Sequence, residues 1–436
     1  MRSDFVFLEV EGRRIDTWTS YKVDSDLLTP ADAFSFEVGF GGIGTNTADR
    51  TRQRAFGELR ELLSPGARVR LYVGDDVTGR ARSRYLQLSG RITEREIDVT
   101  KDAGTTLHLS GHDDSWPMVQ SHVPVSLVRT EGTSFIALVR AAVAPWSVEV
   151  ITDASAARDI LTGRAGLSAE QELLVEQARA QGISPALMRR SLVRRAAREQ
   201  KPLDEYLGVT ASDRARDRSS SGQTPSDIER IQLREARPRP GETVWEFLER
   251  HARRLGVMMW MNPRGQLVLS SPHYSQTPLY SFVRRFENRS DDPNNILGGP
   301  VRDSIGNRVS RVTVYGRTHG SDVERARVRA TASDTDMPLA IEHIVHDNDV
   351  RTEAEANRRA KRELAEATAR ARTVEYALPD HGMGRYLYAV DTMARVVDEW
   401  AGIDEAMYVT GRTFMRSRDG GTTTTVRLAR RGSIVL

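Results

Sequence analysis

The residues best suited to chemistry lie in two short stretches that carry histidine and aspartate. The segment "HIVHDND" places His343, His346, Asp347 and Asp349 close together, and a His-x-x-His pair can contribute to a metal site. No second ligand pair with the usual spacing stands nearby. A solvated polar loop between a strand and a helix therefore fits this segment better than a metal site.

The segment "GHDDSWP" offers His112, Asp113 and Asp114 as an acid/base cluster. It stands where a strand would end and the chain would turn, so we interpret it as a turn. Nothing else in the chain assembles into an active site. The sequence therefore predicts neither an enzyme nor a bound metal ion or cofactor.

Other binding signals have simpler structural explanations. The run Gly41 to Gly44 lacks the strand-to-helix context and the lysine of a phosphate-binding loop. Trp245 and Trp260 could stack on a sugar, but both stand in elements whose apolar faces need filling. A basic run could contact phosphate groups, but helical spacing disperses it over more than one helix face; it consists of Arg189, Arg190, Arg194, Arg195 and Arg198.

Composition narrows the class of protein. A chain of 436 residues predicts two or three domains. No apolar run approaches the length of a membrane-spanning helix, and we expect no stable membrane insertion and no secretory signal. The chain has no cysteine, which excludes disulfides and thiolate metal sites. Its 63 basic and 60 acidic residues are too evenly balanced to argue for nucleic acid binding.

The ends of the chain have the pattern of β-strands, and its middle has the pattern of helices. "AFSFEVGF" alternates apolar and polar residues, and "FVFLEVEG" and "ARVRLYVGDD" flank it as further strands. Residues 155–221 are rich in Arg and Ala and predict a helical insertion that ends in a polar linker. Residues 241–272 predict a helix, a left-handed Gly256 and a hairpin whose turn is Asn262 to Gly265. An amphipathic helix is expected at 351–372.

Two distant stretches repeat one pattern: "LQLSGRITEREIDVTKDAGTTLHL" from Leu86, and "MYVTGRTFMRSRDGGTTTTVRL" from Met407. In each, Gly-Arg is followed by Asp-x-Gly-Thr-Thr. The first copy has four more residues between the two motifs, and an even difference preserves the in/out register of a strand. Either any two hairpins look alike at this level, or two related β modules stand at the two ends of the chain.

The second alternative gives an α+β, mainly β fold class. It has two similar small antiparallel β-barrels, at 1–115 and 301–436, and an inserted mixed domain at 116–300 between them. Four segments together resemble the baseplate central hub proteins of contractile phage tails, the Mu-type hub or late control protein D-like tail protein. They are "VEGRRIDTWTSYKV" with "ADAFSFEV", "LSPGARVRLYVGDD" with "TTLHLSGHDDSW", "PGETVWEFLERHARRLGVMMWMNPRGQLVLSSP", and "SRVTVYGR" with "DTMARVVDEWAGIDEAMYVTGRTFMRSRDGGTTTTVRL".

The resemblance implies a structural protein rather than an enzyme. In that family three subunits with two barrels each form a pseudo-sixfold ring around a channel, which adapts a sixfold tail tube to a threefold puncturing spike. The implied partners are a homotrimer, a trimeric spike, the tail tube or a tube-initiator ring, and other baseplate proteins, with no sequence-specific nucleic acid. The implied location is the virion tail baseplate, assembled in the bacterial host cytoplasm.

The two hairpin turns are the candidate site. Their charged, glycine-containing tips have no core to fill, and we expect both to contact one neighbouring ring. The tip residues are Lys101, Asp102 and Gly104 in the first copy, and Arg418, Asp419, Gly420 and Gly421 in the second. Two other functions stay open: a tail-associated cell-wall hydrolase, which needs a carboxylate pair or a metal site, and a DNA-binding module built on the basic helices.

Overall fold

The computed structural model describes residues 6–16, 18–40, 56–73, 86–100, 104–128, 132–152, 225–233, 236–274, 276–316, 328–347, 350–383, 386–417 and 420–434. The glycine run at 41–44, the helical insertion at 155–221 with its basic run, and the tip residues 101, 102, 418 and 419 lie outside these ranges. Among the described residues no helix is long and apolar enough to cross a membrane.

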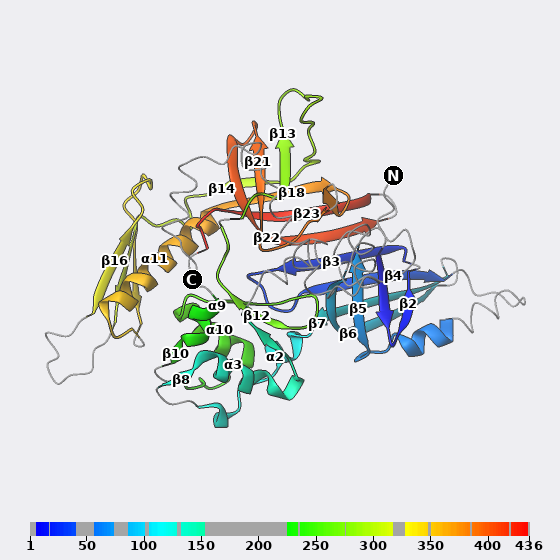
Figure 1. Ribbon diagram of the computed structural model, residues 1–436. Helices are drawn as coiled ribbons and strands as arrows, with labels where there is room; N and C mark the ends of the chain where they lie inside the picture. The colour runs from blue at the N-terminus through cyan, green and yellow to red at the C-terminus, as the bar shows by residue number, and fades with distance from the viewer. Residues whose placement is uncertain are drawn as a thin grey trace, which may run out of the picture.

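The fold is mainly β, and its largest element is one long sheet of 13 strands (Figure 1). The main path of the sheet runs through β14 (Val301–Asp303), β18 (Arg372–Pro379), β23 (Gly421–Arg430), β22 (Ile403–Ser417), β3 (Ser20–Asp26), β4 (Ala33–Phe40), β7 (Gly104–Asp113), β6 (Leu86–Thr100), β5 (Arg68–Val73), β1 (Val6–Val10) and β2 (Arg13–Ile15). Beside this path, β21 (Thr392–Asp398) pairs with β22, and β13 (Tyr280–Arg284) pairs in parallel with β21.

The two ends of the chain join edge to edge in this sheet. Strand β22 pairs antiparallel with β3, from Gly411 opposite Asp26 to Arg416 opposite Tyr21. The strands from both ends also share one hydrophobic core, in which Phe34 and Phe36 of β4 lie with Val426 and Leu428 of β23. The described strands close no barrel, so the structure differs here from the two predicted barrels: backbone pairing between the ends makes one open sheet.

The middle of the chain forms a helical unit below the long sheet in Figure 1. Its helices are α2 (Trp116–Gln120), α3 (Phe135–Val143), α9 (Pro225–Arg230) and α10 (Val244–Arg254), with short 3-10 turns at Val125–Leu127 and Ala144–Trp146. Two small sheets complete it: β8 (Thr133–Ser134) with β10 (Gln232–Leu233), and β9 (Val150–Ile151) with β11 (Met258–Met261) and β12 (Leu267–Ser270). These elements surround a core separate from that of the long sheet.

Helix α10 and the hairpin β11–β12 have the local structure that their sequence predicts. Thr243 and Glu246 form a capping box at the start of α10. Gly256 after its last turn has a φ of 72°, in the left-handed region. Trp245 and Trp260 are each only 5% exposed and belong to apolar clusters, which confirms that they are core residues.

A third unit lies at the left of Figure 1, away from the long sheet. Helix α11 (Glu353–Ala371) packs on a sheet of β16 (Arg329–Ser333), β15 (Arg311–Tyr315) and β17 (Glu342–His346), which has its own apolar cluster. The expected amphipathic helix is therefore present, but it covers this small sheet. Nearly buried Arg362 on α11 donates to the carbonyl of Arg253 at the end of α10, 3.0 Å away. A short hairpin of β19 (Gly382–Met383) and β20 (Tyr386–Leu387) and a helical segment at 56–62 complete the described elements.

Candidate assembly interface

The repeated hairpins are equivalent elements of the structure. Strands β6 and β22 each have 15 residues, and β7 and β23 each have 10. Leu86 and Ile403, where β6 and β22 begin, are 317 positions apart, and so are Gly104 and Gly421, where β7 and β23 begin. Within each hairpin the long strand has one β-bulge, at Thr93 of β6 against β7 and at Thr410 of β22 against β23, again with this separation. Strand β6 has a further register shift at Gln87, against β5.

The shared register corrects one part of the sequence comparison. The Gly-Thr-Thr segments after the two turns are equivalent, as predicted. The two Gly-Arg motifs are not, because the shift of 317 positions places Arg95, and not Arg91, at the position of Arg412. The apparent four-residue insertion therefore does not exist in the strands.

The neighbours of the two hairpins follow the same order. In the first module the order is β5, β6, β7, β4, β3, and in the second it is β21, β22, β23, β18, β14. Phe34 of β4 lies opposite Gly111, and Val374 of β18 lies opposite Leu428, which is 317 positions after Gly111. Strand β4 thus corresponds to β18, and β3 corresponds to β14.

The two modules differ in what covers the second half of the long strand. In β22 this half pairs with β3, and Phe414 is fully buried there. In β6 the equivalent half pairs with β7, but its other edge has no strand partner among the described residues. Ile97 and Val99 on this half are 36% and 55% exposed. Apolar residues at an unpaired edge indicate a surface that another strand can cover.

Charged groups hold the occupied joint between β22 and β3. Arg427 Nε donates to Asp26 Oδ2 at 2.9 Å, and Arg427 Nη2 donates to Asp24 Oδ1 at 3.1 Å. A side chain at Gly411 would meet both this guanidinium and Asp26 Oδ2, at 2.7 Å from the latter. Thr413 also donates to Asp24. The joint thus needs glycine on one strand and a cluster of opposite charges across it.

A buried histidine lies beneath the same joint. His381 Nε2 is 2.8 Å from the hydroxyl of Tyr21, and its Nδ1 is 3.0 Å from Thr424 Oγ1. Because the Thr424 hydroxyl donates to the carbonyl of Asp380, it accepts from His381 Nδ1, and Nε2 accepts from Tyr21. Burial, and next the Arg412 guanidinium, lower the pKa of His381 to about 3. The imidazole is therefore neutral in the folded protein.

Fully buried Arg412 shares this polar interior. Its guanidinium lies 4.0 Å from the ring centroid of Phe414, and burial lowers its pKa to about 10. Asp32 stands nearby and its own pKa is raised well above the usual range by burial and then by Asp113. Cation–π contact and neighbouring carboxylates compensate this charge in place of a direct ion pair.

The long strands of the two hairpins run in the same direction. Each of the steps from β22 through β3, β4 and β7 to β6 is antiparallel, so β6 and β22 run in the same direction. Gly420 follows the second turn, where its amide donates to Ser417 Oγ, and Gly421 begins β23 with a φ of 66°. Gly104 begins β7 at the equivalent place.

The other predicted residues do not form a catalytic or metal site. His343 and His346 lie on the strand β17 rather than in a loop; they are three positions apart, so alternation places them on opposite faces. Asp347 pairs with Arg359 at 3.7 Å, and Asp349 lies outside the described residues. Within the described ranges no group of three or more His, Asp or Glu side chains could hold a metal ion.

The His112–Asp114 segment lies where a strand ends and the chain turns, as predicted: His112 and Asp113 are the last residues of β7, and the turn begins at Asp114. Asp113 Oδ1 accepts from the amide and the hydroxyl of Ser115 at 2.9 and 2.5 Å. Burial raises the pKa of Asp113 to about 6, against the effect of these hydrogen bonds. Asp114 faces Gly265 in the turn of β11–β12, where an added Cβ would lie 2.5 Å from Asp114 Oδ2. The segment therefore docks the middle unit onto the sheet.

Over β3, β4, β18 and the second half of β6, the side of the long sheet that faces away from its core is polar and predominantly acidic. Seven carboxylates alternate with buried apolar residues along its strands: Asp24, Asp26, Glu37, Glu94, Glu96, Asp98 and Glu375. Three basic side chains lie in this acidic part, namely Lys22, Arg302 and Arg427. Further arginines share the same side beyond it, over β2, β5 and the first half of β6: Arg14, Arg68, Arg70 and Arg91. Because Arg427 is already paired with two of the carboxylates, the acidic part repels other anions.

Domain models of phage tail proteins match three segments in chain order. The N-terminal domain of Mu phage baseplate assembly protein GpP-like proteins matches residues 5–91. The second domain of baseplate hub protein gp44-like proteins matches residues 225–271, and the third domain of tail protein NMB1110-like proteins matches residues 308–364. None of these models describes an enzyme. No curated protein matches the chain by sequence.

Solved tail proteins share the fold over almost the whole chain. A tail protein from Neisseria meningitidis MC58 matches with a TM-score of 0.66 and 21% identity, covering 99% of this chain and 98% of that protein. The 43 kDa tail protein of prophage MuSo2 from Shewanella oneidensis matches with a TM-score of 0.67 and 15% identity, covering 99% and 100%. Prophage tail protein gp18 from Listeria monocytogenes EGD-e matches with a TM-score of 0.52 and 8% identity, covering 97% and 94%.

The chain thus has the fold of phage tail proteins. The family models and the two full-length matches from Neisseria and Shewanella support a baseplate hub-type tail protein, with a structural role and a location in the virion tail. This confirms the resemblance found in the sequence.

Proposed function

We propose that three copies of this chain form a closed ring by extending the long sheet, and that the ring is the hub which adapts a sixfold tail tube to a threefold spike. The observation that carries the proposal is the joint between β22 and β3. It shows how one module docks on an equivalent module. The second half of β6 is equivalent to that of β22, and β14 is equivalent to β3; among the described residues each of them has one edge without a partner strand. Repeating the joint between copies gives a heterologous contact, which closes a ring when the rotation between copies is a whole fraction of a turn. The proposal takes this rotation to be one third of a turn.

The register of the proposed joint follows from the equivalences. Val23 lies opposite Phe34 in β3–β4, and Val301 lies opposite Val374 in β14–β18, so Val301 takes the place of Val23. The next residue along, Arg302, takes the place of Asp24. Asp24 faces Thr413 across the occupied joint, and Glu96 has the position of Thr413.

Glu96 of one copy therefore faces Arg302 of the next in this register. By the same rule Arg95 faces Asp303, since these residues take the places of Arg412 and Ser25, which lie opposite each other. Within one chain Arg95 Nη1 also donates to the carbonyl of Arg60, in the helical segment at 56–62. Both pairs have opposite charges, and directly opposed charges of unlike sign stabilise antiparallel strands. The apolar contact is between Ile97 and Val301, at the positions of Phe414 and Val23.

The ring has a purpose that a single module lacks. Three chains with two modules each present six similar hairpins on one side, while the complete chain repeats three times. The acidic part of the sheet would line a channel through which DNA passes without adhering, because its carboxylates repel phosphate. The partners in this proposal are the tail tube or a tube-initiator ring, the trimeric spike and other baseplate proteins, and the complex would assemble in the bacterial host cytoplasm.

A charge exchange at the proposed joint tests the ring. Native mass spectrometry and sedimentation should show a trimer for the unchanged chain, and monomers for Glu96→Arg and for Arg302→Glu at the same concentration, because each variant opposes two like charges. A chain carrying both substitutions restores the opposite pair and should recover the trimer.

Lys22→Glu is the matched control, since it reverses one charge on the same side of the sheet but at β3, away from both edges. It should leave the trimer intact. A chain that stays monomeric at every concentration would contradict the ring, and a double variant that stays monomeric would contradict the Glu96–Arg302 register.

A further inference from the structure

Two aromatic side chains stand exposed on the second module, outside the elements that form the ring. Phe286 follows β13, and Trp400 lies in the turn between β21 and β22; they are 64% and 69% exposed. Their ring centroids are 4.8 Å apart with an interplanar angle of 68°. Figure 1 shows β13 and β21 above the long sheet, on the side away from the helical unit. An edge-to-face pair in water leaves apolar area uncovered that a partner would bury.

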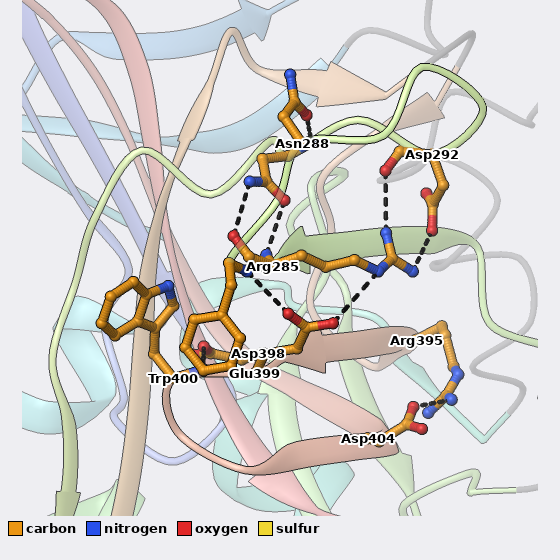
Figure 2. A network of polar contacts seen from close by, with 10 residues as sticks. Arg285, Asn288, Asp292, Arg395, Asp398, Glu399, Trp400 and Asp404 are labelled. Carbon is orange, nitrogen blue, oxygen red and sulfur yellow. Dashed lines mark hydrogen bonds and ion pairs between the residues drawn. The ribbon is translucent and has the colours of Figure 1, made fainter.

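Hydrogen bonds fix the two segments that carry the pair, as Figure 2 shows. The amide of Phe286 donates to Glu399 Oε2 at 2.8 Å, which ties the segment after β13 to the turn. Arg285 Nη2 donates to Asp292 Oδ2 at 2.6 Å. Asn294 Oδ1 accepts from the amide of Arg285 at 2.7 Å, and its amide group donates back to the carbonyl at 3.0 Å. The rings are therefore held in place before any partner binds.

The turn that carries Trp400 rests on a buried carboxylate. Asp398 Oδ1 accepts from the amides of Trp400 and Ala401 at 3.1 and 3.2 Å. Burial alone would raise the pKa of Asp398, but hydrogen bonds from Arg284 and Tyr376 lower it. A preorganised aromatic surface loses little conformational entropy on binding, which is a property of interface hot spots.

The aromatic pair occurs once in the chain, whereas the hairpin occurs twice. Trp400 precedes β22, at the end of that strand opposite its hairpin tip. The equivalent connection of the first module, between β5 and β6, has the sequence "GDDVTGRARSRY" at residues 74–85, with no Trp or Phe. A partner of this surface therefore meets three sites per trimer and not six.

The rim of the pair is acidic. Within 285–292 and 399–404, the exposed charged residues are four carboxylates and one arginine: Glu287, Asp291, Glu399, Asp404 and Arg289. The other arginines of this region pair with carboxylates: Arg285 with Asp292 and, at 4.0 Å, with Glu399, and Arg395 with Asp404. The acidic character of the rim therefore depends mainly on Glu287 and Asp291. Exposed rim charges select a partner by complementary charge.

We propose that the Phe286–Trp400 surface docks a partner protein once per subunit, through a segment that presents a bulky apolar side chain flanked by lysine or arginine. The apolar side chain covers the two rings, and the basic groups face the carboxylates of the rim and the aromatic faces. The site lies on the second module alone, so it is present in the monomer as well as in the ring.

The test uses a displayed library of random twelve-residue peptides, selected on the full chain and counter-selected on the Phe286→Ala/Trp400→Ala chain. The enriched peptides should share a bulky apolar residue with lysine or arginine beside it. In fluorescence anisotropy, Trp400→Ala should weaken the best labelled peptide about tenfold or more. Glu287→Lys/Asp291→Lys should weaken it as well. Added salt should weaken binding of the peptide to the unchanged chain but strengthen its binding to this variant, because salt screens the repulsion between like charges.

Leu297→Ala is the matched control, because Leu297 is 62% exposed but lies away from the aromatic pair on the segment before β14. It should bind the peptides like the unchanged chain. Thermal melts should be the same for all variants, since the altered side chains are exposed. Absence of enrichment, enrichment of peptides without basic residues, or loss of a self-associated form on Trp400→Ala in the absence of peptide would each overturn the proposal. None of these results depends on whether the ring forms.

Discussion

The β6–β7 and β22–β23 hairpins have the same length, the same bulge and the same neighbours, but they differ in the residues at their outer edge. At the joint with β3, the second hairpin has Gly411 and Arg427, which lie opposite each other and meet Asp26. At the equivalent places the first hairpin has Glu94 and Ser110, whose hydroxyl donates to Glu94 at 3.3 Å. The second hairpin thus carries the residues that fit an edge covered by β3 of the same chain.

The two hairpins therefore share a fold without sharing an interface. Backbone pairing sets the shared geometry of the two hairpins. Side chains at the edge then decide which strand each hairpin accepts, because like charges or a side chain in place of Gly411 would prevent pairing with β3. The first hairpin exposes alternating charged and apolar residues at its edge, as a strand that pairs between copies requires.

The largest expected difference between the hairpins is at the equivalent residues Phe414 and Ile97. Phe414→Ala removes a fully buried ring at the occupied joint and should lower the free energy of unfolding by about 3–5 kcal/mol. Ile97→Ala should cost no more than about 1 kcal/mol in the monomer, but should weaken the trimer. Urea denaturation of both variants at concentrations below trimer formation measures the first effect, and sedimentation measures the second.

Equal losses of monomer stability in these two variants would show that the edge of β6 is already covered within one chain. The comparison would then fail. Val99→Ala offers a control for Ile97→Ala, because Val99 is the more exposed of the two residues, at 55%. Its effect on the monomer should be smaller still.

The next largest effect is a pH dependence of the free energy of unfolding, caused by His381 beside the second module. The pKa of His381 is about 3 in the folded protein and about 6.5 in the unfolded chain. As pH falls, His381 therefore binds a proton in the unfolded chain before it does so in the folded protein. Neutral His381 makes its full contribution to the free energy of unfolding above pH 6.5, and this contribution decreases as the pH falls toward 3. The slope approaches about 1.4 kcal/mol per pH unit.

His381→Asn should flatten the dependence of unfolding free energy on pH between pH 6 and pH 4, as measured by urea denaturation. Asp113 acts in the opposite sense, since its raised pKa makes the folded state hold a proton up to about pH 6, but it contributes equally to both chains and cancels in their difference. Tyr21→Phe is the control: it removes the hydroxyl but keeps His381 buried, so the acid slope should persist. A slope unchanged in His381→Asn would mean that another group causes it.

Local elements could be predicted from the sequence, and contacts between distant elements could not. The apolar stripe and Gly256 indicated α10, and the alternation around Phe34 and Phe36 indicated β4. The Asp-x-Gly-Thr-Thr turns indicated the register of the repeat correctly. The Gly-Arg motifs were misleading, because the first lies before the β-bulge of its strand and the second lies after it. The position of a bulge is set by strand pairing and is not marked by a residue pattern.

The joint between β3 and β22 and the Phe286–Trp400 surface could not be predicted from local sequence patterns. Strand β3 pairs with β22 through backbone groups that every sequence has. The side chains that fit this joint, Gly411, Arg427 and Asp26, can be identified as partners only after the two strands have been placed side by side. Phe286 and Trp400 come together only because β13 pairs in parallel with β21. Likewise, α11 was recognisable as amphipathic, but the sheet that it covers is formed by three strands whose pairing order is mixed.

The smallest expected effect on stability is at the hairpin tips, where the two modules should behave alike. We propose that both tips contact one neighbouring ring, because β6 and β22 run in the same direction and end in equivalent turns. Shortening both turns to two residues should leave trimer mass and melting temperature unchanged, since a turn with no core contributes little to stability. It should abolish co-sedimentation with purified tail tubes, and shortening one turn should weaken it partly. Unchanged co-sedimentation of the doubly shortened chain would place the tube contact elsewhere. A loss caused by the second turn alone would show that the ring meets the tube through three contacts and not six, which would end the functional equivalence of the two hairpins.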